Sequence, residues 1–224
     1  MTNVIAVLPA AGVGSRMGSD IPKQYLTIGN KTLLEHAIER LFNHPYIHEV
    51  IVAINANDHW YYRLSISNDI RVRVVTGGLV RTHSVMAALR YTKTASWVLV
   101  HDASRPCLHQ DDLFRLLKIV AYTNIGGVLA VPVRDTIKRA YAGSKNIFVT
   151  VDRKDLWHAL TPQLFSRNLL VICLEKVISK NITITDEASA LEYCGYSPLL
   201  VPGRADNIKV TYPEDLELAR FFLS

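Results

Sequence analysis

Short apolar segments alternate with helical patterns along most of the chain. The first is Val4-Ile5-Ala6-Val7-Leu8, and similar segments lie at residues 49–54, 97–101 and 127–132. Continuous apolar runs of this length are typical of parallel strands that are buried on both faces. After the first of them, Thr32-Leu33-Leu34-Glu35 forms a capping box that precedes apolar residues at helical spacing. The alternation therefore predicts a layered sheet rather than a helical bundle.

Further segments fit the same alternation. Residues 71–75 and 207–210 are predicted as shorter strands, and 85–91 and 110–122 as helices. Thr211-Tyr212-Pro213-Glu214 predicts the start of a last helix, because proline suits an early helical position. Together these segments predict an α/β fold with a Rossmann-like, mostly parallel twisted sheet and helices on both faces.

Length and composition agree with one domain. The 224 residues, of which 49% are apolar and 20% charged, can bury a substantial core, so we expect a single domain over 1–224. The net charge of +5 comes without a block of Lys or Arg, which argues against a nucleic-acid partner. A generally basic surface and a site for anionic small molecules both remain open.

The cysteines and the apolar segments predict a cytosolic protein. Cys107, Cys173 and Cys194 are far apart and lack the spacing of a zinc site. No stretch approaches the ~20 apolar residues of a membrane span, and the N-terminus lacks a signal-peptide pattern. We therefore expect no membrane partner.

Residues 133–162 break the alternation. They contain β-prone pieces around Ala-Gly-Ser-Lys and no helical period, and they are too long for a simple connection. We predict a protruding β-arm here that is used in dimerisation; the alternative is that it folds back on its own domain. A second subunit would cover its apolar side chains, which are Ile137, Ile147, Phe148, Val149 and Trp157.

A glycine-rich loop follows the first apolar segment, in LPAAGVGSRMGSDIPKQYL. Its glycines at 12, 14 and 18 are one residue too widely spaced for the dinucleotide fingerprint G-x-G-x-x-G. The Lys-Ser/Thr pair of a P-loop is also missing. Both standard phosphate motifs are therefore excluded by spacing.

The same loop has the residues that nucleotidyl transfer needs. Arg16 and Lys23 can neutralise charge on a reacting phosphate and on a leaving pyrophosphate. The alternative is that both are solvated surface charges. Small side chains let a triphosphate approach the backbone at Ala10, Ala11, Gly12 and Gly14.

Asp102 follows the predicted strand 97–101, at the sheet edge where ligands bind in such folds. Mg²⁺ takes one or two carboxylates together with phosphates and waters, so Asp102 is a candidate metal ligand. Arg105 adds a cation to the same loop. We expect the neighbouring His101 to be a buried or capping histidine rather than a ligand.

Several motifs occur together: PAAGVGSRMG, PKQYL, VHDASRPC, VRDT, TVDR, TPQ, ITDEASALEY and NIKVTYPEDL. With them the chain, over essentially its whole length, resembles the 2-C-methyl-D-erythritol 4-phosphate cytidylyltransferases of isoprenoid synthesis. The resemblance implies that CTP and 2-C-methyl-D-erythritol 4-phosphate, with Mg²⁺, give the cytidine diphosphate derivative and pyrophosphate by in-line attack on the α-phosphorus.

The resemblance also implies roles for residues. Arg16 and Lys23 stabilise the transition state, and Arg153 and Lys209 position the acceptor phosphate. Asp102 would bind the metal and, with Arg105, the acceptor. The acceptor site is lined by Thr136, Thr161 and Thr185. The cytidine and its ribose would be held by Pro9, Ala10, Ala11, Gly12, Gly77, Gly78 and Ser84, and Gly14 and Ala103 are further candidates for substrate binding.

The resemblance further implies a homodimer with exchanged arms, in which Thr136, Arg153 and Thr161 serve the neighbouring site. Two positions depart from the family pattern. Leu79 stands where an acidic residue often follows the second glycine, and Ser104 stands where alanine is common.

Three other functions fit part of the sequence. A cytidylyltransferase for another polyol phosphate, such as ribitol 5-phosphate, would share the glycine loop, but ITDEAS and NIKVT favour methylerythritol phosphate. A non-catalytic nucleotide-binding module is disfavoured because the charged residues that catalysis would need are all present. They are Arg16, Lys23, Asp102, Arg153 and Lys209. A dinucleotide-binding oxidoreductase is disfavoured by the glycine spacing.

Overall fold

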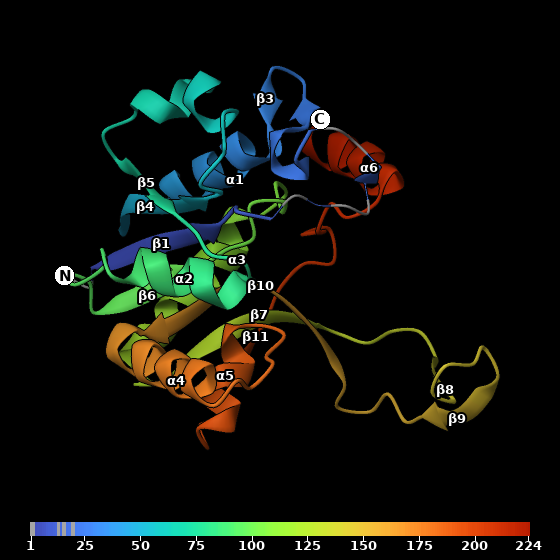
Figure 1. Cartoon of the computed structure of the whole chain (residues 1–224). Coiled ribbons are helices and arrows are strands. Elements are labelled where there is room, and N and C mark those ends of the chain that lie inside the picture. Colours follow the sequence, from blue (N-terminus) through green and yellow to red (C-terminus); the bar gives the residue numbers. More distant parts are fainter. Residues whose placement is uncertain (1–2, 13, 15–16, 19–20) are drawn as a thin grey trace.

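The computed structural model describes residues 3–12, 14, 17–18 and 21–224, and a seven-stranded twisted sheet forms its centre (Figure 1). In spatial order the strands are β11 (Leu199–Pro202), β7 (Gly126–Pro132), β10 (Trp157–Ser166), β6 (Trp97–Val100), β1 (Val4–Pro9), β4 (Ile47–Ile54) and β5 (Val72–Thr76).

The sheet is mostly parallel, as predicted. Strands β6, β1, β4 and β5 pair in parallel, and so do β11 and β7. In the described part of this central sheet, β10 alone runs antiparallel to its neighbours, β6 and β7. The reason is the path of the chain: β7 leads out into the arm, and β10 is the strand that returns from it.

Alternate side chains of β1 belong to two different apolar cores. Val4, Ala6 and Leu8 point to one face of the sheet, and Ile5 and Val7 point to the other. This explains why the segment is apolar at every position. The first core is covered by α1 (Leu33–Phe42) and α3 (Gln110–Lys118), and the second by α2 (Arg81–Leu89), α4 (Arg167–Ser179) and α5 (Glu187–Tyr193).

The predicted helix starts are confirmed in two cases. Thr32 caps α1, since its Oγ1 accepts from the backbone N–H of Glu35 at 3.2 Å and the Glu35 carboxylate accepts from the Thr32 N–H at 2.8 Å. Pro213 is the first residue of α6 (Pro213–Leu223). Helix α2 begins at Arg81, four residues before the predicted start. No helix in the described part of the chain is long and apolar enough to cross a membrane.

Two predicted elements are wrong in their boundaries or type. Residues 207–210 form no strand, because their side chains and carbonyl groups are bound at the site described below. Residues 157–162, predicted as part of the arm, belong to β10 in the central sheet.

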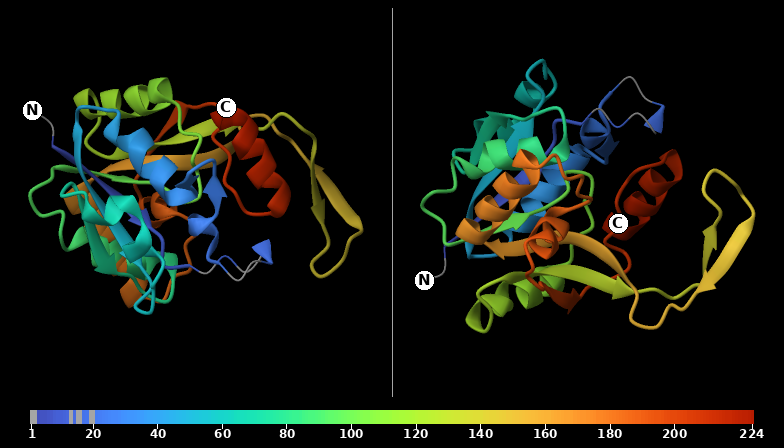
Figure 2. Two further views of the ribbon diagram at one scale, coloured as in Figure 1. Left: turned by 90° about the horizontal axis from the view of Figure 1, so that it is seen from above. Right: turned by 60° about the horizontal axis from the view of Figure 1, so that its bottom comes forward.

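The arm itself is a hairpin of β8 (Ile137–Ala140) and β9 (Ile147–Val151), which forms a separate two-stranded sheet. Both views of Figure 2 show it reaching away from the body. Ile147, Phe148 and Val149 are exposed on it. A smaller hairpin of β2 (Thr27–Ile28) and β3 (Lys31–Thr32) packs near α6, where a third apolar cluster lies.

Gly126 gives a test of the β7–β10 junction. Its φ is +129°, and a Cβ there would lie 2.1 Å from the carbonyl oxygen of Leu164 and 2.7 Å from the Cα of Phe165. We predict that Gly126→Ala lowers the free energy of unfolding by about 3 kcal/mol, measured by urea denaturation. Gly29 is the matched control, because its φ is +62° but nothing lies within 4 Å. Gly29→Ala should cost only about 1 kcal/mol, and equal losses in the two variants would contradict the predicted clash.

Candidate functional site

Three adjoining pockets lie at the carboxyl edge of the sheet. We call them the loop pocket (about 110 Å³), the α5 pocket (about 220 Å³) and the arm-base pocket (about 450 Å³). Lys209 lines all three. Of the predicted residues, the loop pocket is lined by Pro9, Ala10, Gly12, Gly14, Lys23, Asp102, Ala103 and Lys209. The α5 pocket is lined by Asp102, Arg105, Thr161, Thr185 and Lys209.

Gln24 anchors the glycine loop. Its Nε2 donates to the carbonyl oxygens of Ala10 at 2.7 Å and Gly12 at 3.1 Å, and the side chain is buried. The next residue, Tyr25, donates through its hydroxyl to Oδ2 of Asp58 at 2.6 Å. The PKQYL segment therefore holds the backbone of the loop after β1 in place.

Lys23 passes directly over Gly14. Its Nζ donates to the carbonyl oxygen of Val210 at 3.0 Å. A Cβ on Gly14, whose φ is +68°, would lie 2.8 Å from Lys23 Cγ. Glycine is thus needed at position 14 to make room for the lysine as well as for its backbone conformation. Arg16, the other predicted cation of this loop, lies outside the described residues.

Asp102 is the centre of the charged cluster, and its side chain is almost fully buried. Its Oδ1 accepts from Nη1 of Arg81, and its Oδ2 accepts from Lys209 Nζ at 3.0 Å and Arg105 Nε at 3.3 Å. Burial alone would raise the pKa of Asp102, but the charges of Arg81, Lys209 and Arg105 hold it well below its usual range. The carboxylate is therefore ionised at neutral pH.

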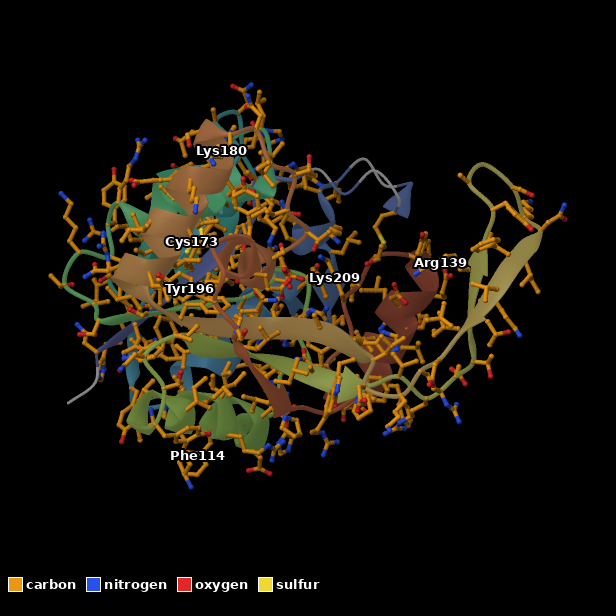
Figure 3. The ribbon with its side chains drawn as sticks, turned by 90° about the horizontal axis from the view of Figure 1, so that it is seen from below. Phe114, Arg139, Cys173, Lys180, Tyr196 and Lys209 are labelled. Carbon is orange, nitrogen blue, oxygen red and sulfur yellow. The ribbon has the colours of Figure 1, made fainter. Side chains whose placement is uncertain are left out.

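Arg105 and the 207–210 segment support each other. Arg105 Nη1 donates to the carbonyl oxygen of Asn207 at 2.6 Å, and Asn207 Nδ2 donates to the carbonyl oxygen of Thr161 at 2.8 Å. These contacts place Lys209, two residues later, beside Asp102. In Figure 3, Lys209 lies on the side of the body that faces the arm.

His101 is buried and fully bonded, which confirms the prediction that it is a buried histidine. Burial lowers the pKa of His101 to about 4, so the ring is neutral. Thr161 Oγ1 accepts from the Asp102 N–H at 3.0 Å and lies 3.0 Å from Nδ1 of His101, while Nε2 lies 3.1 Å from the Arg105 carbonyl. One tautomer satisfies all three contacts: Nε2–H donates to Arg105, and Nδ1 accepts from Thr161.

The position of Thr161 corrects one expectation. The resemblance implies that Thr161 serves the neighbouring subunit's site, but its hydroxyl bonds Asp102 and His101 of its own chain. Thr161 therefore positions Asp102 and His101 of its own subunit.

The second predicted glycine loop lies beside the first. A Cβ on Gly77 would lie 2.8 Å from the Cβ of Ala11, so the two loops are in contact. Ser84 is buried, and its Oγ accepts from the Gly78 N–H at 3.1 Å. Leu79, the departure from the family pattern, is 100% exposed; the side chain points to solvent in this structure.

The predicted arm residues lie apart from the Asp102 cluster. Thr136 and Arg153 are exposed, and Arg153 Nη1 donates to the carbonyl oxygen of Arg134. Arg134 lines the arm-base pocket. Within the chain, the structure therefore does not bring Arg153 together with Asp102.

Among the described residues, the site also contains side chains that were not predicted as functional, and these include Gln24, Arg81, Glu187 and Asn207. Arg81 lines both the loop pocket and the α5 pocket, and Glu187 binds it. Glu187 shows a weak signal in the sequence, since it opens a helix whose neighbouring residues Ala188, Ala190 and Leu191 are apolar. Nothing in the sequence shows its partner, which is 106 positions away.

The donor set fits a divalent cation that also binds phosphate. Asp102 offers one ionised carboxylate at the wall between the loop and α5 pockets. Among the residues that the structure describes, no group of three or more His, Cys, Asp or Glu could hold an ion by itself. A metal here would therefore take its other ligands from substrate phosphates and water, as Mg²⁺ prefers.

The fold and the site are those of a nucleotidyltransferase, with a glycine loop, a lysine and an ionised aspartate at the carboxyl edge of a mostly parallel sheet. Residues 4–224 match the family profile described as "IspD: 2-C-methyl-D-erythritol 4-phosphate cytidylyltransferase". The chain belongs to this family.

Individual relatives agree. Proteins named 2-C-methyl-D-erythritol 4-phosphate cytidylyltransferase are 70% identical in Sodalis glossinidius (99% of this chain, 93% of the relative) and 62% identical in Serratia proteamaculans (99% and 94%). A crystal structure of that enzyme from Francisella tularensis superimposes with a TM-score of 0.84 at 34% identity, covering 99% of this chain and 100% of the other.

Thr161 provides a test of the site's internal support. Thr161→Val keeps the shape but removes the hydroxyl, which leaves the Asp102 N–H and His101 Nδ1 unpaired in a buried place. We expect the free energy of unfolding to fall by about 2 kcal/mol in urea titrations. Thr161→Ser keeps the hydroxyl and should cost about 1 kcal/mol or less, for the lost methyl. A valine variant as stable as the serine variant would show that the hydroxyl is not structural.

Proposed function

We propose that this protein transfers the cytidylyl group of CTP to 2-C-methyl-D-erythritol 4-phosphate and releases pyrophosphate, a step in isoprenoid precursor synthesis. The observation that carries the proposal is the wall between two pockets: Asp102, Arg81 and Lys209 line both the loop pocket and the α5 pocket. A transfer between two anionic substrates needs such a shared, cation-rich boundary, since the substrates otherwise repel each other.

The loop pocket suits the nucleotide. Small residues and backbone groups from Pro9 to Gly12 let the triphosphate lie close to the chain. The adjoining loop of Gly77 and Gly78, with Ser84, is proposed to hold the cytosine and ribose. Its contact with Ala11, which follows Ala10 of the loop pocket, supports this role.

The α5 pocket suits the acceptor. Lys209 and Arg105 face it with two positive charges, and Thr185 lies at its rim. The three cations around Asp102 and Glu187 leave the cluster one net positive charge, which favours a phosphate monoester. Lys209 is proposed to hold the acceptor phosphate together with Arg153 and Thr136 of a partner subunit's arm.

The reaction needs no general base. A phosphate monoester has a second pKa of about 6, so its attacking oxygen is already ionised at neutral pH. This oxygen forms a bond to the α-phosphorus of CTP, while the bond from the α-phosphorus to the bridging oxygen breaks and its electron pair leaves with pyrophosphate. Lys23 and Arg16 are proposed to stabilise the charge on the α-phosphoryl oxygens and the leaving group.

We propose Mg²⁺ as the divalent cation, held by Asp102 and by phosphate oxygens. When bound, it would neutralise phosphate charge and orient the triphosphate. Asp102 now shares its oxygens with Arg81, Arg105 and Lys209, so a metal would compete with these cations for the carboxylate.

We also propose that the protein acts as a cytosolic homodimer with exchanged arms. The arm has few contacts of its own to cover Ile147, Phe148 and Val149, and a second copy would bury them. The cysteines are free thiols, as a reducing compartment requires.

An acceptor assay tests the function. Purified protein with CTP, Mg²⁺ and 2-C-methyl-D-erythritol 4-phosphate should release pyrophosphate, because the α5 pocket would position this phosphate beside the loop pocket. Ribitol 5-phosphate should be a much poorer acceptor. Comparable turnover of both acceptors would contradict the assignment, and so would the absence of pyrophosphate with either.

Mixing two inactive variants tests the exchanged arm. If Arg153 serves the partner's site, a dimer of one Lys23→Ala subunit and one Arg153→Ala subunit contains one intact site. A mixture at equal amounts should then regain about a quarter of the wild-type activity, because about half of the dimers are mixed. Native mass spectrometry of differently tagged subunits verifies the exchange. Proven exchange with no regained activity would place Arg153 in its own subunit's site.

A further inference from the structure

Glu187 is a buried carboxylate that has no role in the proposed reaction as described above. It is the first residue of α5, and only 1% of its surface is exposed. A buried charge needs a close partner, and Glu187 has one in Arg81. Its Oε1 accepts from Arg81 Nε at 3.1 Å, and its Oε2 accepts from Arg81 Nη2 at 3.0 Å. This two-bond geometry fixes the plane of the guanidinium group.

The remaining nitrogen of Arg81 is bound on the opposite side. Nη1 donates to Oδ1 of Asp102, so the guanidinium bridges two carboxylates. Arg81 is therefore not available as an independent phosphate cation, because its charge is matched on both sides. Its position instead decides where Oδ1 of Asp102 lies.

The position of Glu187 is itself fixed from the sheet. Gln163 of β10 donates through Nε2 to Oδ2 of Asp186 at 2.7 Å and accepts through Oε1 from the Ala188 N–H at 3.0 Å. These two bonds hold the first turn of α5 on both sides of Glu187. The chain of contacts thus runs from β10 through Glu187 and Arg81 to Asp102.

We propose that Arg81 and Glu187 are a positioning pair for cytidylyl transfer. Glu187 orients Arg81, and Arg81 holds Oδ1 of Asp102 at the wall between the nucleotide and acceptor pockets. Oδ2 is thereby turned toward Arg105 and Lys209. The inference rests on the proposed function, since it assigns the pair to that reaction.

A purely stabilising role makes a different prediction. A buried ion pair can often be replaced by apolar side chains of similar size with little or no loss of stability. If stability were the only role of this pair, the double variant Arg81→Met/Glu187→Met would fold and remain active. For a positioning pair, the same variant folds but loses activity, because nothing holds Oδ1 of Asp102.

The experiment compares variants in the pyrophosphate-release assay. Glu187→Gln should lower kcat by about 10- to 100-fold, the usual effect of losing a supporting contact, with KM for both substrates changed by less than about 3-fold. Glu192→Gln, on the exposed side of α5, is the matched control and should match the wild type. Should Glu187→Gln fail to fold, the double methionine variant decides: folded and inactive supports the pair, and folded and active overturns it.

Chemical rescue adds a readout that a structural role would not give. The Arg81 side chain is 29% exposed, so a free guanidinium ion can reach its place. Added guanidinium should raise the turnover of Arg81→Ala but not that of Arg81→Ala/Glu187→Ala, which lacks the carboxylate that orients it. Equal rescue of both variants, or no rescue of either, would overturn the pair.

The pyrophosphate-release assay of the wild-type protein distinguishes a failure of the proposed function from a failure of the positioning pair. If it releases no pyrophosphate, the proposed function fails and the pair falls with it. If it is active while folded Glu187→Gln keeps the wild-type kcat, the positioning pair alone is wrong.

Discussion

The ionised carboxylate of Asp102 is the interaction on which the rest of the site depends. It is buried at the end of the central strand β6, where an unpaired charge would be strongly unfavourable. Arg81, Arg105 and Lys209 compensate it. Arg105 lies three residues after Asp102, but Arg81 and Lys209 come from distant parts of the chain, so the site is complete only when the start of α2, the sheet and the C-terminal segment are all in place.

The same carboxylate also determines where positive charge lies in the site. The carboxylate holds Arg81 and Lys209 at the wall that the loop and α5 pockets share, and Arg105 on the side of the α5 pocket. Each of two anionic substrates therefore meets cations at the boundary that it must approach for transfer. The neutral ring of His101, held between Thr161 and the Arg105 carbonyl, fixes the backbone beneath this wall without adding charge.

The sequence correctly predicts those parts of the structure that depend on residues close together in the chain. The apolar run at 4–8, the capping box at Thr32 and the position of Asp102 at a strand end all rest on neighbouring residues. Residues 157–162 of strand β10 are predicted as part of the arm, and the sequence offers little signal against this, because Pro162 is unusual in a central strand. The structure accommodates Pro162 where the pairing with β7 shifts register, between Ala159 and Gln163. The Arg81–Glu187 contact could not be predicted, because no pattern in one sequence identifies partners so far apart.

The segment 207–210 shows why a short alternation of polar and apolar residues need not form a strand. Ile208 and Val210 have the spacing of a strand, but the polar groups of the segment bind different partners instead of pairing with a neighbouring strand. The Asn207 carbonyl binds Arg105, Lys209 binds Asp102, and the Val210 carbonyl binds Lys23. Lys23, proposed to act on the leaving group, is therefore bound by Val210, and Lys209, proposed to hold the acceptor, is the residue next to it in the same segment. Since that segment is also tied to Thr161 and Ser104, the spacing between the two cations is set by the backbone rather than by flexible side chains alone, which is the preorganisation that transition-state stabilisation requires.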